Sequence, residues 1–420
     1  MAQQPALNIL AISYDLPPTL SPQAIQIGRL LSRSRHRIVA VSGPSRAEGP
    51  STDCNRLREA VDRHVVPFSR HSGGLLKRIA RRSLPLYGTT PDVYRGWIEP
   101  AGRFVTNLIA SGAAKPDLII SFGDPMSDHL IGYHLKQRFR LPWLAHFSDP
   151  WSDNPFRRFQ PLSSIVNRAL ERRVIEGADA TAFTSDETVE LVFGKYPNAL
   201  RARSEVLPHT FDGDAYPKDE GEAPRAVLLR YIGNFYGHRT PEPLFRALAH
   251  LLKVAPTVLQ GVAIEIVGGI PNRMLRSASF EALPPGLVTV RGTVSYTESL
   301  RLMCSSDILL TIDAPAPLSV FFPSKLVDYI GSGRRLVGLV PPGAAARVIG
   351  ELGGRSVPPD APVEAISQML REEIIEARAR KRSPLEGPRQ LWRKYAIDNV
   401  APMFDSLCSR VVENAGASRS

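Results

Sequence analysis

Short apolar runs of strand length recur along the whole chain, and helical stretches separate them. Most of these runs are bounded by Gly, Pro, Ser or Asp, and several are continuously apolar rather than alternating. Continuous apolar runs are typical of strands that are buried on both faces of a parallel sheet. The predicted strands are Ile9–Ile12, Arg37–Val41, Leu118–Ser121, Trp143–Phe147, Ala180–Thr184, Ala226–Ile232, Ala263–Val267, Val288–Arg291, Ile308–Ile312 and Leu336–Leu339.

Helical patterns lie between these runs. Gln23–Ser34 carries apolar residues near one face, and Leu244–Leu252 follows a Pro-Glu pair that suits a first helical turn. Thr297–Ser305 has an acidic residue in its first turn, which suits the helix dipole. Farther along, Pro362–Arg382 and Gln390–Val412 are both amphipathic. Strands that alternate with helices in both halves predict an α/β protein of two doubly wound domains.

A polar segment rich in Pro, Gly, Asp and Glu joins the two halves at residues 208–224. This composition is typical of a linker, and 420 residues fit two domains of about 200 residues each. We therefore predict an N-terminal Rossmann-like domain at 1–212 and a C-terminal one at 213–388. A returning C-terminal helix at 389–412 and a frayed tail at 413–420 complete the chain.

Composition bounds the class of protein and its compartment. Hydrophobic residues make up 43% of the chain and charged residues 22%, which excludes a mainly disordered protein. The 3 cysteines lie far apart, so the sequence shows neither a disulfide framework nor a CxxC zinc site, and a reducing compartment is favoured. We see no signal peptide and no apolar run near the roughly 20 residues of a transmembrane helix. We expect a cytoplasmic protein.

Basic residues outnumber acidic ones by 52 to 41, a net charge of +11, and part of this surplus is clustered. No acidic residue occurs from Arg63 to Pro91, and residues 75–82 place apolar and basic side chains on opposite sides of a helical wheel. This pattern is typical of a helix that lies on an anionic membrane, although a solvated helix docked on its domain has it too. No nucleic-acid module is recognisable. We predict peripheral contact with the inner face of the plasma membrane and no nucleic-acid partner.

Candidate site residues follow strands, because ligands of open α/β sheets bind beyond the carboxyl ends of the strands. In the N-terminal half, His146 and Asp149 come where a buried strand ends. A His–Asp pair there can orient a substrate hydroxyl or exchange protons with it, and we take these two residues as the catalytic candidates. A structural histidine at a strand end is the competing interpretation. No Ser or Cys at recognisable spacing completes a nucleophilic triad.

Two other loops of the N-terminal half follow strands. Residues 13–24 lack the GxGxxG fingerprint of dinucleotide-binding domains, and Ser21 there suits a helix cap. Residues 122–129 combine a Gly with Asp, Ser and His, which suits the rim of a cleft. The plainer interpretation of this loop is a turn followed by Ser127 as a helix cap.

The C-terminal half has a loop suited to a diphosphate. It begins with Gly233 and Asn234 after the first strand of that half and reaches Arg239. Its two glycines free the backbone, and the guanidinium supplies a forked cation. A loop that begins a helix and carries an exposed Arg is the alternative.

A second segment of the C-terminal half places three polar residues at the start of a helix. Ser324 follows a proline, so backbone donors and the Lys325 ammonium point at one spot. Asp328 lies three residues after Lys325 on the same face, where it can accept hydrogen bonds from a ribose diol. A solvated Lys–Asp pair is the alternative.

In their order and spacing these segments resemble the family-4-like glycosyltransferases of the GT-B fold, of the bacterial polysaccharide and lipid-linked glycan type. The resemblance covers nearly the whole chain. The segments that carry it are residues 17–18, 118–132, 149–151, 177–179, 207–212, 233–236, 306–310 and 323–333.

The resemblance implies a GT-B fold, in which two Rossmann-like domains face each other across a cleft and the C-terminal helices cross back to the N-terminal domain. It implies a metal-independent, retaining, hexosyltransferase-like enzyme with no cofactor. Such an enzyme moves a sugar from a nucleotide-diphosphate donor to a cell-surface polysaccharide or a lipid-linked acceptor. The donor site would be formed by the Gly233 loop, Arg239, Lys325 and Asp328, which stands in place of the family's ribose-binding Glu.

The chain departs from the family at one acidic position. The family has two Glu residues eight positions apart. In this chain Asp328 stands at the later position and Val320 at the earlier one, and Asp313 is the nearby acid that can substitute for the earlier Glu. Two alternatives therefore stand beside the transferase: a non-hydrolysing nucleotide-sugar epimerase of the same fold, and a catalytically impaired binding or scaffold member of a polysaccharide assembly complex.

Overall fold

The computed structural model describes residues 5–19, 21–45, 57, 59–68, 90–155, 161–217, 226–379 and 389–417. The chain divides into two compact units. One unit is Met1–Pro208 with Ile397–Ser420, and the other is His209–Ala396. The predicted basic helix at residues 75–82 lies outside the described residues.

Parallel strands form the sheet of the first unit, in the order β3-β2-β1-β4-β5-β6-β7. Strand order reverses between β1 and β4, which is the switch point of a doubly wound fold. The strands are β1 (Asn8–Ile12), β2 (Arg37–Ser42), β3 (Val61–Val65), β4 (Leu118–Gly123), β5 (Trp143–Phe147), β6 (Ala180–Phe183) and β7 (Ser204–Val206).

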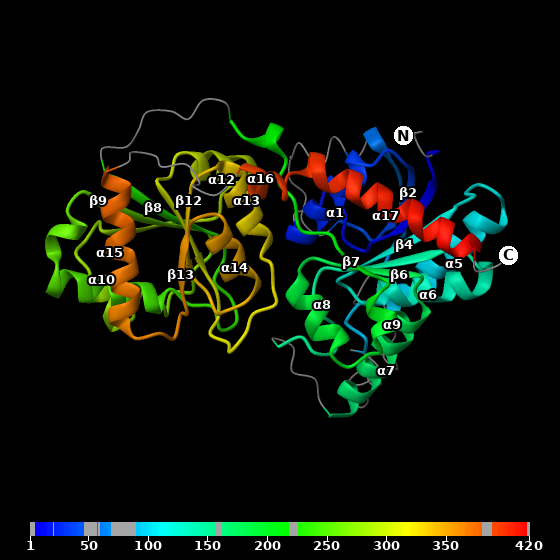
Figure 1. Cartoon of the computed structure of the whole chain (residues 1–420), viewed down its shortest axis with the longest axis horizontal. Coiled ribbons are helices and arrows are strands. Elements are labelled where there is room, and N and C mark those ends of the chain that lie inside the picture. The colour runs from blue at the N-terminus through cyan, green and yellow to red at the C-terminus, as the bar shows by residue number, and fades with distance from the viewer. Residues whose placement is uncertain are drawn as a thin grey trace. The chain divides into compact units, whose positions relative to one another are not determined.

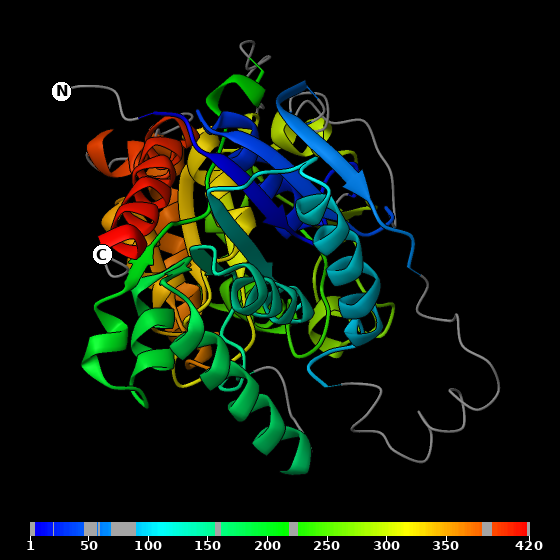
Figure 2. The ribbon, with the colours of Figure 1, turned by 90° about the vertical axis from the view of Figure 1, so that its right-hand side faces the viewer.

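Helices cover both faces of this sheet. Apolar residues of α1 (Pro22–Arg33) and α17 (Ile397–Ala417) form the core on one face. On the other face, the core residues come from α5 (Ile98–Ala110), α6 (Ser127–Phe139), α7 (Pro161–Gly177) and α8 (Asp186–Phe193). Figure 2 shows α17 in red and α5 in cyan on opposite sides of the sheet. The short η1 (Arg95–Trp97) and α9 (Asn198–Arg201) complete the unit.

Polar contacts fix α17 on the first unit. The Asp405 carboxylate accepts hydrogen bonds from the Ser34 hydroxyl at 2.5 Å and from the Arg35 amide at 3.1 Å. The ring of His36 accepts from the Leu7 amide through Nδ1 at 3.1 Å, so Nε2 carries the proton toward the Asp405 carbonyl at 3.2 Å. The C-terminal helix is therefore built into the first unit by buried hydrogen bonds as well as by apolar packing.

The sheet of the second unit is also fully parallel, in the order β10-β9-β8-β11-β12-β13. Figure 1 labels β8, β9, β12 and β13 of this sheet. Its switch point lies between β8 and β11. The strands are β8 (Val227–Ile232), β9 (Val262–Val267), β10 (Val288–Arg291), β11 (Ile308–Ile312), β12 (Arg335–Leu339) and β13 (Arg355–Val357).

The second sheet likewise has helices on both faces. Core residues of α10 (Glu242–Val254) and α15 (Val363–Ala379) pack on one face. Those of α12 (Tyr296–Cys304), α13 (Ser324–Ser332) and α14 (Ala344–Glu351) pack on the other. The short elements are η2 (Gly213–Ala215), η3 (Pro256–Leu259), α11 (Ala278–Glu281) and α16 (Arg389–Arg393). No helix among the described residues is long and apolar enough to cross a membrane.

The predicted α/β fold with two doubly wound sheets is confirmed, and each of the ten predicted strands is a strand of the structure. The prediction of one helix over Gln390–Val412 is wrong, because the chain forms α16 and α17 with a break at residues 394–396. The units divide at Pro208, within the segment expected to be a linker. Phe211 of that segment is buried in the core of the second unit.

Candidate functional site

Two loops meet at the switch point of the second unit, beyond the carboxyl ends of β8 and β11. Gly233 follows β8 with φ 150°, and its amide donates to the Val267 carbonyl at 2.8 Å. Asp313 follows β11, and its amide donates to the Leu339 carbonyl at 2.9 Å. Nη2 of Arg239, in the loop after β8, lies 2.8 Å from Oδ1 of Asp313. An ion pair therefore joins the two loops at the place where doubly wound sheets bind ligands.

Arg239 has one unused donor in a buried position. Its Cζ lies 4.9 Å from the centre of the Tyr236 ring, while Nε is buried and has no hydrogen-bond partner. Burial is the largest single influence and lowers the pKa of this guanidinium, but the Asp313 carboxylate and the side chains of Tyr231 and Tyr236 together outweigh it, so that the pKa is raised. The Nε donor of this charged guanidinium therefore lacks an acceptor. A buried donor without a hydrogen bond lowers the stability of the folded state by about 1–3 kcal/mol.

Lys325 brings a second cation to the same loops from the first turn of α13. Its Nζ donates to the Tyr231 hydroxyl at 3.0 Å and lies 4.2 Å from the centre of that ring. A Cβ added at Gly233 would lie 3.6 Å from Lys325 Cδ, so the side chain runs beside the Gly233 backbone. Burial, and then the charge of Arg239, hold the pKa of Lys325 well below its usual range.

A tight contact between two strand ends fixes the Gly233 loop. Gly268 has φ 126°, and a Cβ there would lie 2.2 Å from the Gly233 carbonyl oxygen. Asn234, a predicted donor-binding residue, accepts a hydrogen bond from the Gly269 amide through Oδ1 at 2.7 Å. Its amide side chain therefore holds the loops after β8 and β9 together. Sequence reasoning did not single out Gly268 and Gly269, although a Gly pair at the end of a predicted strand is a recognisable signal.

The remaining predicted donor-site residues lie on α13. Ser324 is its first residue, and Asp328 accepts a hydrogen bond from the Tyr296 hydroxyl through Oδ1 at 2.9 Å. Tyr329 accepts from the Ile232 amide at 2.8 Å, which ties α13 to the end of β8. The structure thus brings the Gly233 loop, Arg239 and Lys325 together, whereas the Asp328 carboxylate contacts Tyr296 of the neighbouring α12.

In the first unit, His146 lies buried near the end of β5. Its Nδ1 is buried without a hydrogen-bond partner, so this nitrogen does not bond the partly exposed Asp149. Burial lowers the pKa of His146 to about 4, and the imidazole is therefore neutral at physiological pH. A neutral imidazole can orient a hydroxyl or accept its proton, but it supplies no positive charge.

The loop at residues 122–129 is built from buried polar contacts. Ser127 is not the cap of α6: Asp92, from a distant segment, accepts hydrogen bonds from its amide at 2.9 Å and its hydroxyl at 2.8 Å. Asp128 is buried and accepts from the Tyr14 amide at 2.7 Å and from Trp97 Nε1 at 2.7 Å. The Tyr14 bond joins the loop after β1 to the start of α6 at the switch point of this unit, and the Asp92 and Trp97 bonds join the segment before α5 to the same helix start.

Ser21 and His129 are two further predicted residues of the first unit. Ser21 caps α1 as predicted, because its hydroxyl accepts from the Ala24 amide at 3.1 Å. His129 was predicted as part of a cleft rim, but it is fully buried, with Nδ1 2.8 Å from the Ser121 hydroxyl and Nε2 without a partner. Among the described residues, no group of three or more His, Cys, Asp or Glu is arranged to hold a metal ion.

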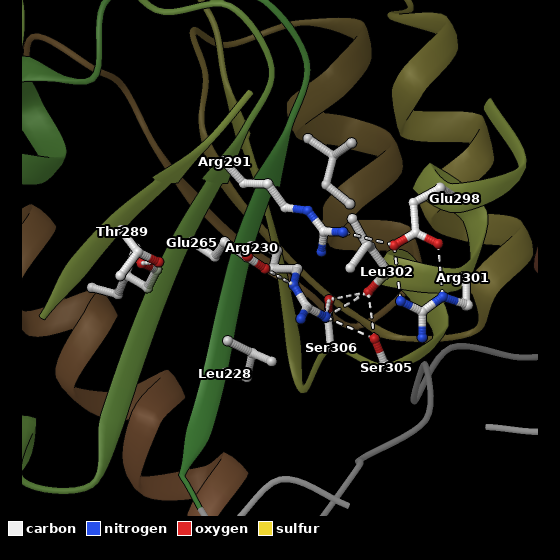
Figure 3. Close-up of polar contacts among 12 residues, drawn as sticks. Leu228, Arg230, Glu265, Thr289, Arg291, Glu298, Arg301, Leu302, Ser305 and Ser306 are labelled. Atoms are coloured by element: carbon white, nitrogen blue, oxygen red, sulfur yellow. Dashed lines mark hydrogen bonds and ion pairs between the residues drawn. The ribbon is translucent and has the colours of Figure 1, made fainter. Parts of the chain in front are cut away.

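A second charged cluster of the second unit lies at the other end of β11 (Figure 3). Arg230 of β8 bonds Glu265 of β9 through Nε at 2.5 Å. Its Nη1 donates to the Leu302 carbonyl and to the Ser305 hydroxyl, each at 2.8 Å, just before β11 begins. This guanidinium is occupied by protein acceptors on both sides, so the cluster is structural.

Comparison with known proteins identifies what the chain is similar to. Residues 20–209 match the family described as "Glycosyl transferase 4-like domain". No curated protein matches the chain. A glycosyltransferase of Rickettsia africae is similar in structure, with TM-score 0.64, 12% identity, and 97% of this chain and 99% of that chain covered.

Two further solved structures cover nearly the whole chain. WaaG, a glycosyltransferase involved in lipopolysaccharide biosynthesis, has TM-score 0.57 and 16% identity over 97% of this chain and 98% of its own. A putative UDP-N-acetylglucosamine 2-epimerase of Listeria monocytogenes has TM-score 0.55 and 11% identity over 95% of both chains. At such identities the likeness shows the fold alone, and that fold is the predicted one.

Proposed function

Because the chain has the GT-B fold and its residues 20–209 match the glycosyl transferase 4-like domain, we propose that it is a glycosyltransferase that takes its sugar from a nucleotide diphosphate. The proposed donor site is the second unit, at the Gly233 loop with Arg239 and Lys325. The observation that carries the proposal is the buried, unpartnered Nε of Arg239 at the switch point, because a diphosphate oxygen is the acceptor this fork lacks.

The two cations suit the chemistry of the leaving group. In the transfer, the bond between the anomeric carbon and the diphosphate oxygen breaks, and its electron pair stays on that oxygen. The acceptor hydroxyl oxygen forms the new bond to the anomeric carbon and releases its proton. Charge therefore grows on the diphosphate, where Arg239 and Lys325 would stabilise it. We propose that the transfer retains the anomeric configuration and uses these cations rather than a metal.

The first unit would hold the acceptor. We propose that the neutral His146 orients a sugar hydroxyl, with Asp149 three residues further along the chain as a second polar contact. A polysaccharide or lipid-linked acceptor suits a protein that touches the inner face of the plasma membrane through residues 75–82. Vesicles with and without anionic lipid test that contact by co-sedimentation; a bound fraction that does not depend on anionic lipid would contradict it.

A panel of nucleotide-sugars tests the proposed function. The protein is mixed with each donor and with a lipid-linked glycan fraction, and released nucleoside diphosphate is measured together with the glycosylated product. We expect one donor to give both products in equal amounts, and loss of both in Arg239→Gln. If no donor released its nucleoside diphosphate or gave a glycosylated product, the proposal would be contradicted.

The epimerase alternative has one observation in its favour, the similarity to the Listeria epimerase over 95% of both chains. An epimerase inverts a sugar stereocentre in the nucleotide-sugar without an acceptor. NMR of the donor incubated with the protein alone separates the two functions, because a transferase leaves that stereocentre unchanged.

The scaffold alternative rests on Val320, which is buried and apolar where the resembled family has a Glu. It predicts donor binding without turnover across a broad set of acceptors, together with a stable partner in pull-down experiments. Turnover with any acceptor would rule out the scaffold alternative.

A further inference from the structure

The proposed donor site contains an acid as well as two cations. Asp313 lies against Arg239, and burial leaves its side chain 4% exposed. We propose that Asp313 discriminates between donor and product: its carboxylate disfavours the free nucleoside diphosphate more than the nucleotide-sugar, and so speeds product release. This inference rests on the proposed function and adds a role that the transfer chemistry itself does not require.

The ligand's charge changes during the reaction in a way that an acid can sense. In a nucleotide-sugar both phosphates are esterified, so the diphosphate carries two negative charges. After transfer the terminal phosphate is free, and its second ionisation, with a pKa of about 6, adds most of a third charge at neutral pH. A fixed carboxylate in the site repels this added charge, which the intact nucleotide-sugar does not carry.

The Asp313 carboxylate is held in place rather than free to turn away. Its Oδ1 accepts from Nη2 of Arg239 at 2.8 Å and from the Ala314 amide at 2.9 Å. The backbone is tied to β12 through the Leu339 carbonyl at 2.9 Å. Because the acid bonds the same guanidinium that would hold the diphosphate, the two anions must share one cation, and the repulsion between them is weakly screened in a buried place.

The chain provides a matched control in the ion pair between Arg230 and Glu265 (Figure 3). This pair also joins a buried Arg to a carboxylate in the second unit, and its Arg lies on β8, the strand that precedes the loop of Arg239. It lies at the amino end of β11, whereas Asp313 follows the carboxyl end. Arg230 pairs with Leu309 of β11 and with Glu265 of β9, so Glu265 is level with a position four residues, or about 13 Å, before Asp313. Charge repulsion falls with distance, so Glu265 should act less than Asp313 on a diphosphate at Arg239.

The test is a calorimetric comparison of one nucleoside diphosphate with its nucleotide-sugar, at pH 7.5, on four proteins: the wild type, Asp313→Asn, Asp313→Ser and Glu265→Gln. Asn keeps an acceptor for Arg239 and Ala314 but removes the charge. In both Asp313 variants we expect the affinity for the diphosphate to rise about tenfold more than the affinity for the nucleotide-sugar. Glu265→Gln should leave the ratio of the two affinities unchanged. Product inhibition of turnover should strengthen in the same proportion.

Each outcome decides one claim. An affinity ratio within twofold of the wild type in both Asp313 variants would overturn the inference and leave the proposed function intact. Equal weakening of both ligands would make Asp313 only a support for Arg239, and would also overturn it. If the wild type binds neither ligand, the proposed function fails as well. The two Asp313 variants differ in size, so that the loss of one through misfolding leaves the other to be measured.

Discussion

Nη2 of Arg239 and Oδ1 of Asp313 lie 2.8 Å apart and join the loop after β8 to the end of β11. If this guanidinium receives the donor diphosphate, Arg239→Gln should weaken nucleoside diphosphate binding by about 1.5–3 kcal/mol, which is about 10- to 100-fold. The substitution also leaves Asp313 without its cation. The double variant Arg239→Gln with Asp313→Asn removes that complication and should still bind weakly in calorimetry. Recovery of wild-type affinity in the double variant would show that Arg239 does not contact the ligand.

Lys325 predicts a pH dependence of donor binding. Because burial and the charge of Arg239 lower its pKa, the ammonium loses its proton at a lower pH than an exposed lysine would. Diphosphate affinity should therefore fall as the pH rises through the lowered pKa, and binding there should take up protons. Titrations between pH 6.5 and 9.5, in buffers of different ionisation enthalpy, measure both effects. In Lys325→Met the affinity should be lower by about 1.5–3 kcal/mol at the low end of this range, and the pH dependence should flatten. A slope that survives in the variant would assign the titration to another group.

Gly268 tests the geometry of the Gly233 loop. A Cβ at this position would meet the Gly233 carbonyl oxygen at 2.2 Å, and its φ of 126° is strained for an L residue. Gly268→Ala should therefore displace the loop and lower diphosphate affinity at least tenfold, with a loss of stability of about 1–3 kcal/mol. Gly292→Ala is the control, because nothing lies within 4 Å of a Cβ there. Equal affinities in the two variants would show that the loop conformation is not needed for binding.

The buried histidines of the first unit predict a loss of stability in acid. Burial lowers the pKa of His129 to about 3 and that of His146 to about 4, while an unfolded histidine titrates near 6.5. Between about pH 6.5 and 4, the unfolded chain binds protons that the folded chain does not. The free energy of unfolding therefore falls as the pH falls, by about 1.4 kcal/mol per pH unit for each histidine.

Urea unfolding between pH 4.5 and 6.5 measures this effect. Asp128, whose pKa burial raises well above its usual range, titrates in the opposite sense, so the comparison of variants is more informative than the absolute slope. In His129→Asn the free energy of unfolding should depend less steeply on pH than in the wild type, by about 1.4 kcal/mol per pH unit. His238→Asn, at an exposed position of the other unit, is the matched control. If the free energy of unfolding of His129→Asn changed with pH as steeply as that of the wild type, His129 would not be buried in its neutral form.

The predicted strands carry an apolar pattern in their own sequence, and the missed strands do not. Central strands such as β5 and β11 are buried along their whole length, so they appear as continuous apolar runs, and their predicted bounds match the structure. The missed strands are β3, β7 and β13. They are outer strands of their sheets and only partly buried, and β3 has the sequence Val-Asp-Arg-His-Val. The fourth outer strand, β10, is mostly exposed but was predicted, because its sequence Val-Thr-Val-Arg alternates apolar and polar residues. An outer strand faces solvent, and its pairing is decided by the neighbouring strand rather than by its own pattern.

The candidate site was predictable only in part, for a related reason. A strand end marked the Gly233 loop, because loops after parallel strands share one edge of a sheet, and a helix start marked Lys325. The partners of these residues were not readable, since they come from other strands. Tyr231 holds Lys325, and Gly268 fixes Gly233, through contacts that only the sheet order creates. The predicted pairing of His146 with Asp149 does not involve Nδ1 of the histidine, which burial isolates.

The central claim is that the second unit binds a nucleoside diphosphate at Arg239 and Lys325. The direct measurement is calorimetric titration of the wild type with UDP, GDP, ADP, CDP and dTDP, repeated on Arg239→Gln and on the control Glu265→Gln. We predict saturable binding of at least one nucleotide at one site, weakened at least tenfold in Arg239→Gln and unchanged in Glu265→Gln. Binding of none of the five, or equal binding by all three proteins, would contradict the claim.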